Sequence, residues 1–179
     1  MPEVDKFSRS LLEEAKRFLE KAHEEEAEGQ TAFLHAALLL AFSALEAHLN
    51  AVASDFLTRK DLSILDRSIL SEQDFKLEGG DFVLKEGLKM YRLEDRFEFI
   101  YAKFSSSKLD KSASWWAKLK GALHHRNQLV HPKEATKTTP EIVEGALTGI
   151  IDAIDALYAA VYQRPFPAKT RGLQSTLKF

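Results

Sequence analysis

Two residues that can act together on a phosphodiester stand near the end of a predicted helix. They are Arg126 and His131, in the segment RNQLVHP. Arginine carries a permanent positive charge and a planar fork of donors that fits phosphate oxygens. Histidine takes up and releases a proton near neutral pH, as general acid–base catalysis requires. These two residue types could therefore bind a phosphodiester and transfer the protons that its cleavage requires.

The helix that carries this pair is predicted over residues 114–130. Its apolar side chains repeat at helical spacing and share one face: Trp115, Trp116, Leu119, Ala122, Leu123 and Val130. Arg126 falls near the middle of that face, where a charge needs a partner or a polar surface. Proline disfavours helical geometry in the residue before it, so Pro132 should end the helix near Val130. His131 is then on the last turn, about 7 Å along the axis from Arg126.

The sequence around the pair is basic, although the chain as a whole is not. A formal net charge of -2 argues against a protein that coats nucleic acid through bulk electrostatics. Residues 118–137, in contrast, contain five basic residues and one acidic residue, besides three histidines. We therefore expect a local footprint for a phosphodiester, with Lys120 and Lys133 binding the substrate. His124 and His125 project off the apolar stripe and are expected to face solvent.

The segment RNQLVHP resembles the motif of the HEPN superfamily, small all-α proteins whose motif arginine and histidine are separated by four to six residues. Family members typically carry the motif late in the chain, with asparagine after the arginine and proline after the histidine. The segments SALEAHLN (residues 43–50) and LEDRFEFI (residues 93–100) are similar to upstream parts of that family. Arg17 and His23 also have the spacing, but they lack the asparagine and the helix end.

This resemblance, which extends over roughly residues 5–163, implies an endoribonuclease of the kind found in bacterial toxin and defence systems. Such enzymes are homodimers that work without a metal, and two motifs line one cleft between the subunits. Arg126 and His131 would be catalytic, and Asn127 would orient the motif or the phosphate. The product would be a 2′,3′-cyclic phosphate. An antitoxin protein would be a further partner, and the expected compartment is the cytoplasm.

Other interpretations of the same residues stay open. A non-catalytic HEPN module would bind RNA or a protein partner through the same face. Arg126 would then be a structural ion-pair partner, and His131 a helix cap stabilised by the helix dipole. A helical bundle that binds a small molecule would instead have an apolar cavity away from Arg126. Trp115 and Trp116 are expected to anchor the core rather than to stack on bases.

The predicted fold is all-α, an up-and-down antiparallel helical bundle of HEPN type with short extra helices. Hydrophobic periodicity predicts six helices, over residues 6–27, 31–57, 61–72, 91–104, 114–130 and 139–161. Residues 73–90 form an irregular insertion, in which Gly79 and Gly80 indicate either a small hairpin or a loop. We expect one domain over residues 1–163 and an extended tail over 164–179, ordered only if it docks.

The second predicted helix should be the most buried one, because its apolar stripe is broadened by many alanines. It also places His35 and Glu46 on the apolar side. A carboxylate there needs a partner, and Arg126 is the obvious candidate by charge. Glu46 therefore either bonds a neighbouring helix or supports Arg126 in the site. Asp61 is a candidate cap for the third helix, and Ser112 or Ser114 for the fifth.

Several other classes of site are not indicated. The chain has no cysteine, and therefore no disulfide framework or cysteine metal site. Glu20 and His23 match one half of a di-iron motif, but no second copy exists, so no metal is expected. No glycine-rich phosphate loop is present, and no cofactor is expected. The charged N-terminus lacks a signal-peptide core, and the apolar run Ala36 to Leu45 is too short to span a bilayer.

Overall fold

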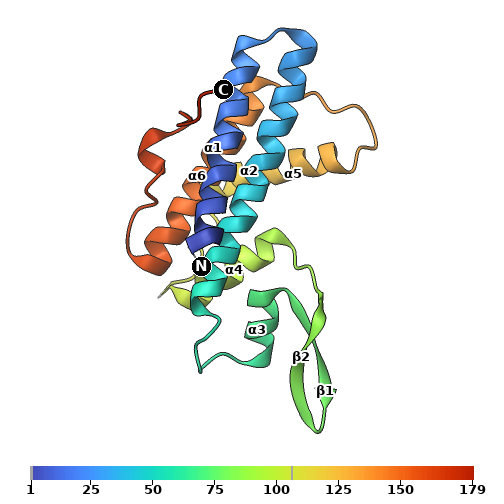
Figure 1. The fold of residues 1–179 in the computed structure, drawn as a ribbon, viewed down its shortest axis with the longest axis vertical. Coiled ribbons are helices and arrows are strands. Elements are labelled where there is room, and N and C mark those ends of the chain that lie inside the picture. Colours follow the sequence, from blue (N-terminus) through green and yellow to red (C-terminus); the bar gives the residue numbers. More distant parts are fainter. Residues whose placement is uncertain (1, 106) are drawn as a thin grey trace.

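The computed structural model describes residues 2–105 and 107–179, and it is mostly helical. Within these residues the chain forms six α-helices, one two-stranded antiparallel sheet and a short 3-10 helix (Figure 1). The elements are α1 (Pro2–Glu24), α2 (Ala27–Phe56), α3 (Ile64–Ser71), β1 (Gln73–Glu78), β2 (Asp81–Leu88), α4 (Leu93–Phe104), α5 (Ser114–Val130), α6 (Pro140–Tyr162) and η1 (Lys169–Arg171). All six predicted helices are present.

Three long helices, α1, α2 and α6, pack side by side and enclose the core (Figure 1). The apolar stripe of α2 is buried except for Phe56, which is partly exposed; its members are Leu38, Phe42, Leu45, Leu49, Val52 and Phe56. The helix α5 crosses this layer instead of running along it (Figure 1). Its first turn is anchored by Trp115 and Trp116, whose rings lie 5.7 and 6.0 Å from that of Phe97. The two tryptophans thus belong to the core contacts.

The helix α2 is long and apolar enough to cross a membrane when only length and composition are considered. Within Glu28–Phe56, the most apolar window of 18 residues has a mean hydropathy of 1.6. However, 56% of its most apolar window is buried inside the fold, and it packs against α1 and α6. The core helix of a compact protein has the same composition.

Three helix ends differ from the sequence expectation. The turn after α1 lies at Glu25 and Glu26, earlier than predicted. Glu26 has the extended backbone of an N-cap, so α2 begins at Ala27 and Gly29 lies in its first turn. The cap of α3 is Ser63, which forms a capping box with Asp66, and not Asp61. The cap position of α5 is Ala113, which has no capping side chain, while the Ser112 hydroxyl bonds Asp110.

The irregular insertion contains a β-hairpin, one of the two structures that the glycine pair allowed. Leu77 pairs with Phe82 across the two strands, and Glu78 pairs with Asp81 next to the turn. Gly79 and Gly80 close the turn with φ angles of +62° and +92°. Two residues with positive φ make the tight turn that suits the twist of a hairpin, and glycine adopts this geometry most readily.

The C-terminal segment folds back along α1. Phe166 is buried at the start of this segment. Further on, Arg171 contacts the Glu13 carboxylate at 2.6 Å, and the Thr176 amide donates to the same carboxylate at 2.6 Å. These contacts hold the pKa of Glu13 below its usual value, against the effect of burial. Residues 164–179 therefore dock on the helical body in an extended course interrupted by η1.

The helix that carries the motif is positioned by a close approach to α6. Gly149 on α6 lies directly against α5, and a Cβ atom at this position would be 2.9 Å from the Lys118 Cβ and 3.2 Å from the Leu119 amide nitrogen. Contacts this short to backbone atoms cannot be relieved by a side-chain rotation. The absence of a side chain at residue 149 therefore allows α5 to reach its position.

We predict that Gly149→Ala destabilises the protein by about 1–3 kcal/mol, because overpacking pushes α5 away from α6. Gly145→Ala is the matched control on the same helix, since nothing lies within 4 Å of the added Cβ. That change should stabilise by up to about 1 kcal/mol through helix propensity. Urea unfolding of both variants measures the difference. Equal effects of the two substitutions would contradict the close approach.

Candidate functional site

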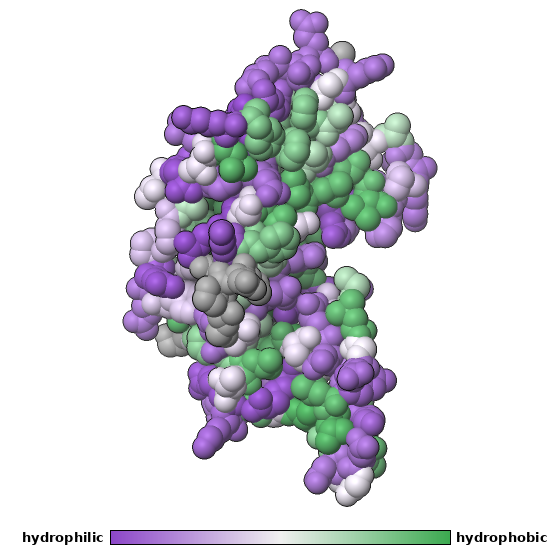
Figure 2. Space-filling view, in the orientation of Figure 1, coloured by the Kyte–Doolittle hydropathy of each residue, from purple (hydrophilic) through white to green (hydrophobic). Residues whose placement is uncertain are grey.

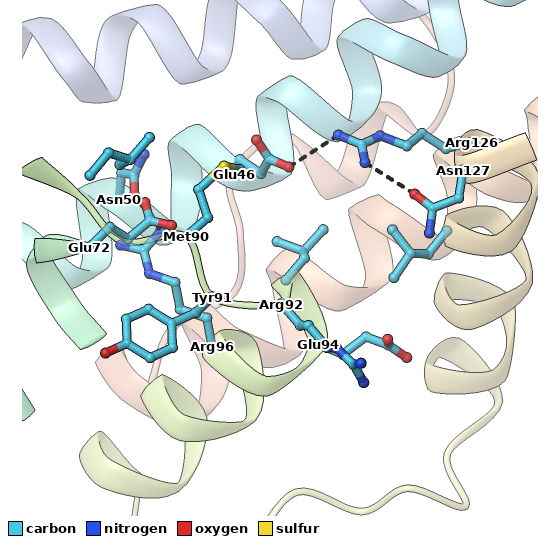
Figure 3. A pocket seen from close by; sticks show the side chains of 13 residues that line it. Glu46, Asn50, Glu72, Met90, Tyr91, Arg92, Glu94, Arg96, Arg126 and Asn127 are labelled. Atoms are coloured by element: carbon cyan, nitrogen blue, oxygen red, sulfur yellow. Dashed lines mark hydrogen bonds and ion pairs between the residues drawn. The ribbon is translucent and has the colours of Figure 1, made fainter. Parts of the chain in front are cut away.

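The guanidinium of Arg126 is held between α5 and α2 by three contacts. Its Nη2 lies 3.6 Å from the Glu46 Oε1, and its Nη1 donates to the Asn127 Oδ1 at 3.1 Å (Figure 3). Its carbon lies 5.8 Å from the centre of the Phe42 ring. The side chain of Arg126 is 28% exposed and that of Glu46 is 44% exposed. The charge is thus oriented by its surroundings but still reaches solvent.

Arg126 lines a cavity of about 570 Å³ between α2, α4, α5 and the segment that joins β2 to α4. Figure 3 shows Arg126 and Asn127 on one side of this cavity and Asn50, Glu72 and Arg96 on the other. In Figure 2 the same face is hollowed between the helical body and the hairpin, and apolar side chains flank the hollow. Its rim contains Leu88 and Met90, which are 74% and 77% exposed.

The far side of the cavity is built around a second arginine, Arg96, which is only 4% exposed. Its Nη1 donates to Asn50 at 2.6 Å and to Glu72 at 2.8 Å. Its other nitrogens donate to the carbonyls of Ile69 and Leu70. Burial lowers the pKa of Arg96, and the Glu72 and Glu46 charges oppose that shift. Because its donors are satisfied, Arg96 ties α4, α3 and α2 together.

His131 stands where α5 ends, as the following proline predicted. Its φ and ψ angles are −125° and 63°, outside the helical region, and its amide donates to the Asn127 carbonyl at 2.9 Å. The residue is exposed. It lines a second hollow of about 350 Å³ together with His124, Gln128 and Lys133. Arg126 and His131 therefore line neighbouring hollows, and Asn127 lines both.

The two predicted substrate-binding lysines have different surroundings. Lys133 is exposed and lines the second hollow beside His131. Lys120 lies on the other flank of α5, where its Nζ is 3.8 Å from the Glu94 Oε1. Glu94 also lines the first cavity. The structure thus brings Glu46, Arg126 and Asn127 together around one cavity, and Asn127, His131 and Lys133 around the other.

Within residues 2–105 and 107–179, no cluster of three or more His, Cys, Asp or Glu side chains is arranged to hold a metal.

The expectation that both neighbouring histidines face solvent is correct for His124 and wrong for His125. His125 is partly buried, and its Nε2 lies 3.1 Å from the hydroxyl of Thr138. Burial, and then the proximity of His35 and His124, lowers the pKa of this imidazole. The segment after Pro132 folds back over α5 and places the buried Thr138 there, which the helical pattern of α5 alone does not indicate.

No protein-family model, no curated protein and no solved structure matches this chain.

His125 should make the stability of the fold depend on pH. Its folded-state pKa lies below the ordinary 6.5, so between these values the unfolded chain binds a proton that the folded chain does not. The free energy of unfolding then falls as the pH drops below about 6.5. We predict that His125→Gln reduces the fall in melting temperature between about pH 7.5 and about pH 5.5.

The control for this prediction is His124→Gln, because His124 is exposed. This variant should keep most of the wild-type pH dependence. If thermal unfolding shows the same dependence in both variants, protonation of His125 is not what weakens the fold.

Proposed function

We propose that this protein is a metal-independent endoribonuclease of HEPN type, with Arg126 and His131 as its catalytic residues. The observation that carries the proposal is the surroundings of the Arg126 guanidinium. It faces a cavity, its nearest carboxylate is 3.6 Å away, and it stands one residue before Asn127, whose carbonyl accepts from the His131 amide. A charge that is oriented but only weakly paired is available to a phosphate.

The chemistry follows from these two side chains. The His131 imidazole takes the proton of the ribose 2′-hydroxyl, and the 2′-oxygen attacks the adjacent phosphorus. The guanidinium of Arg126 stabilises the negative charge that develops on the phosphoryl oxygens. The bond between phosphorus and the 5′-oxygen breaks, and this oxygen takes a proton from a protonated imidazole. The products are a 2′,3′-cyclic phosphate and a free 5′-hydroxyl group.

The proposal includes a homodimer, because one imidazole cannot serve as base and acid at the same time. A second copy of the motif would supply the second histidine. Two observations support an interface at this end of α5. Val130 is 41% exposed, contrary to its place in the apolar stripe, and His131 beside it is exposed too. The finer fold assignment, an up-and-down bundle of HEPN type, belongs to the same proposal.

A non-catalytic RNA-binding module is the second candidate, and one specific observation favours it. Arg126 and His131 line separate hollows in the single chain. Residues in this arrangement can bind successive phosphates of one RNA strand without catalysing cleavage at either. Lys133 in the second hollow adds a further positive charge for that purpose.

We predict that the purified protein cleaves single-stranded RNA in the presence of EDTA. Arg126→Ala should lower the rate by at least about a hundredfold, because the developing phosphoryl charge loses its partner. His131→Ala should lower it by at least about a hundredfold, because proton transfer is lost. Rates are measured on a fluorescently labelled RNA at equal protein concentration.

The matched controls are Arg59→Ala and His23→Ala, which remove an exposed arginine and an exposed histidine remote from both hollows. Both should cleave at the wild-type rate. If the wild-type protein leaves the RNA intact but binds it in an electrophoretic mobility assay, the ribonuclease proposal is wrong. The RNA-binding module is then the remaining candidate.

A further inference from the structure

The cavity beside Arg126 has the size and lining of a nucleotide-binding pocket. Its volume of about 570 Å³ lies within the range of about 300–1,000 Å³ that is usual for small-molecule sites. Leu93 from α4 and Leu123 from α5 both line it and are partly buried. Apolar side chains contributed by two facing helices can hold the flat faces of a base. The cavity also opens to the surface at the hollow visible in Figure 2.

One carboxylate in this lining has a weak partner for its degree of burial. The side chain of Glu94 is 32% exposed, and the Lys120 ammonium stands 3.8 Å away, at the limit of an ion pair. Glu72, on the far side, is paired with Arg96 at 2.8 Å, and Glu46 faces Arg126. A partly buried carboxylate with so distant a partner can accept further hydrogen bonds. Glu94 lies on the same side of the cavity as Asn127 (Figure 3).

We propose that this cavity is a specificity pocket that binds a guanine base of single-stranded RNA, with Glu94 as the residue that recognises it. Guanine presents two adjacent donors, N1–H and the 2-amino group, which match the two oxygens of one carboxylate. Adenine and cytosine present one amino group beside an acceptor, and uracil presents one imino group between two acceptors. The carboxylate of Glu94 thus favours guanine over the other three bases.

The placement of Asn127 connects this pocket to the reaction. Asn127 lines both hollows, so an RNA strand that crosses it has one nucleotide in each. The base lies in the first cavity, and its 3′-phosphate reaches Arg126 and Asn127. The following nucleotide passes His131 and Lys133. The inference rests on the proposed function for this path of the strand, whereas base recognition by Glu94 can be measured without any cleavage.

The test is isothermal titration of the wild-type protein with the four ribonucleoside 3′-monophosphates. Guanosine 3′-monophosphate should bind at least about tenfold more tightly than the other three, since only guanine can donate to both oxygens of the carboxylate. Glu94→Gln should weaken the binding of guanosine 3′-monophosphate by at least about tenfold, because the amide group of glutamine repels one of the two guanine donors. The affinities for the other three nucleotides should change by less than about threefold, because their bases do not use the second oxygen of Glu94.

The matched control is Glu98→Gln, one turn further along α4, where the carboxylate pairs with Lys111 at 2.8 Å outside the cavity. It should bind all four nucleotides as the wild type does. If the wild-type protein binds the four nucleotides equally, or binds none of them, the proposal of a guanine pocket is wrong. The wild-type measurement alone decides this. A preference for guanine that survives Glu94→Gln overturns the role of Glu94.

Sequencing the ends of cleaved RNA separates this inference from the proposed function. Cleavage after guanine by the wild type, and after all four bases by Glu94→Gln, supports both. Cleavage by the wild type without base preference leaves the ribonuclease intact and overturns the pocket. Binding of guanosine 3′-monophosphate without cleavage of any RNA supports the pocket and overturns the ribonuclease.

Discussion

The contact between Arg126 and Glu46 is the interaction on which the site depends. It joins the last turns of α5 to the central helix, and it does so at 3.6 Å, with both side chains partly in solvent. An exposed pair of this kind contributes at most about 1 kcal/mol to stability. Its effect is to direct the guanidinium toward the cavity while leaving its charge available.

The second arginine of the cavity shows the opposite arrangement. Arg96 is buried and donates to two side chains and two carbonyls, so its charge and its hydrogen bonds are satisfied within the protein. It fixes the wall on which α4 begins and the hairpin ends. Arg96 thus builds the wall of the cavity, whereas Arg126 faces the space inside it. This difference in pairing, more than the motif alone, makes Arg126 the candidate for chemistry.

The sequence predicted the helices because each has an apolar stripe that must be buried, and tertiary packing then follows that stripe. The end of α5 was predictable from local geometry, since Pro132 disfavours helical geometry in His131, the residue before it. The pairing of Glu46 with Arg126 could be anticipated from charge and helical position, because a carboxylate on the apolar side of a helix needs a partner. The structure leaves Glu46 44% exposed, so it is less buried than its position predicted.

The remaining features depend on segments that are distant in sequence. Arg96 is one of several charges in LEDRFEFI, and only the approach of α3 and Glu72 reveals that it is buried. Thr138 reaches His125 because the loop after Pro132 folds back. The division of the site into two hollows depends on where α4 and this loop stand beside α5. No spacing within a single helix indicates such placements.

The chemistry of the cleaved ends tests the account most directly, because it reports on the reaction itself and not on binding. Mass spectrometry of RNA cleaved by the wild-type protein in EDTA should find 2′,3′-cyclic phosphate on one fragment and a 5′-hydroxyl group on the other. Fragments that carry a 3′-hydroxyl group and a 5′-phosphate, formed only when a divalent metal ion is present, would contradict an Arg126 and His131 mechanism.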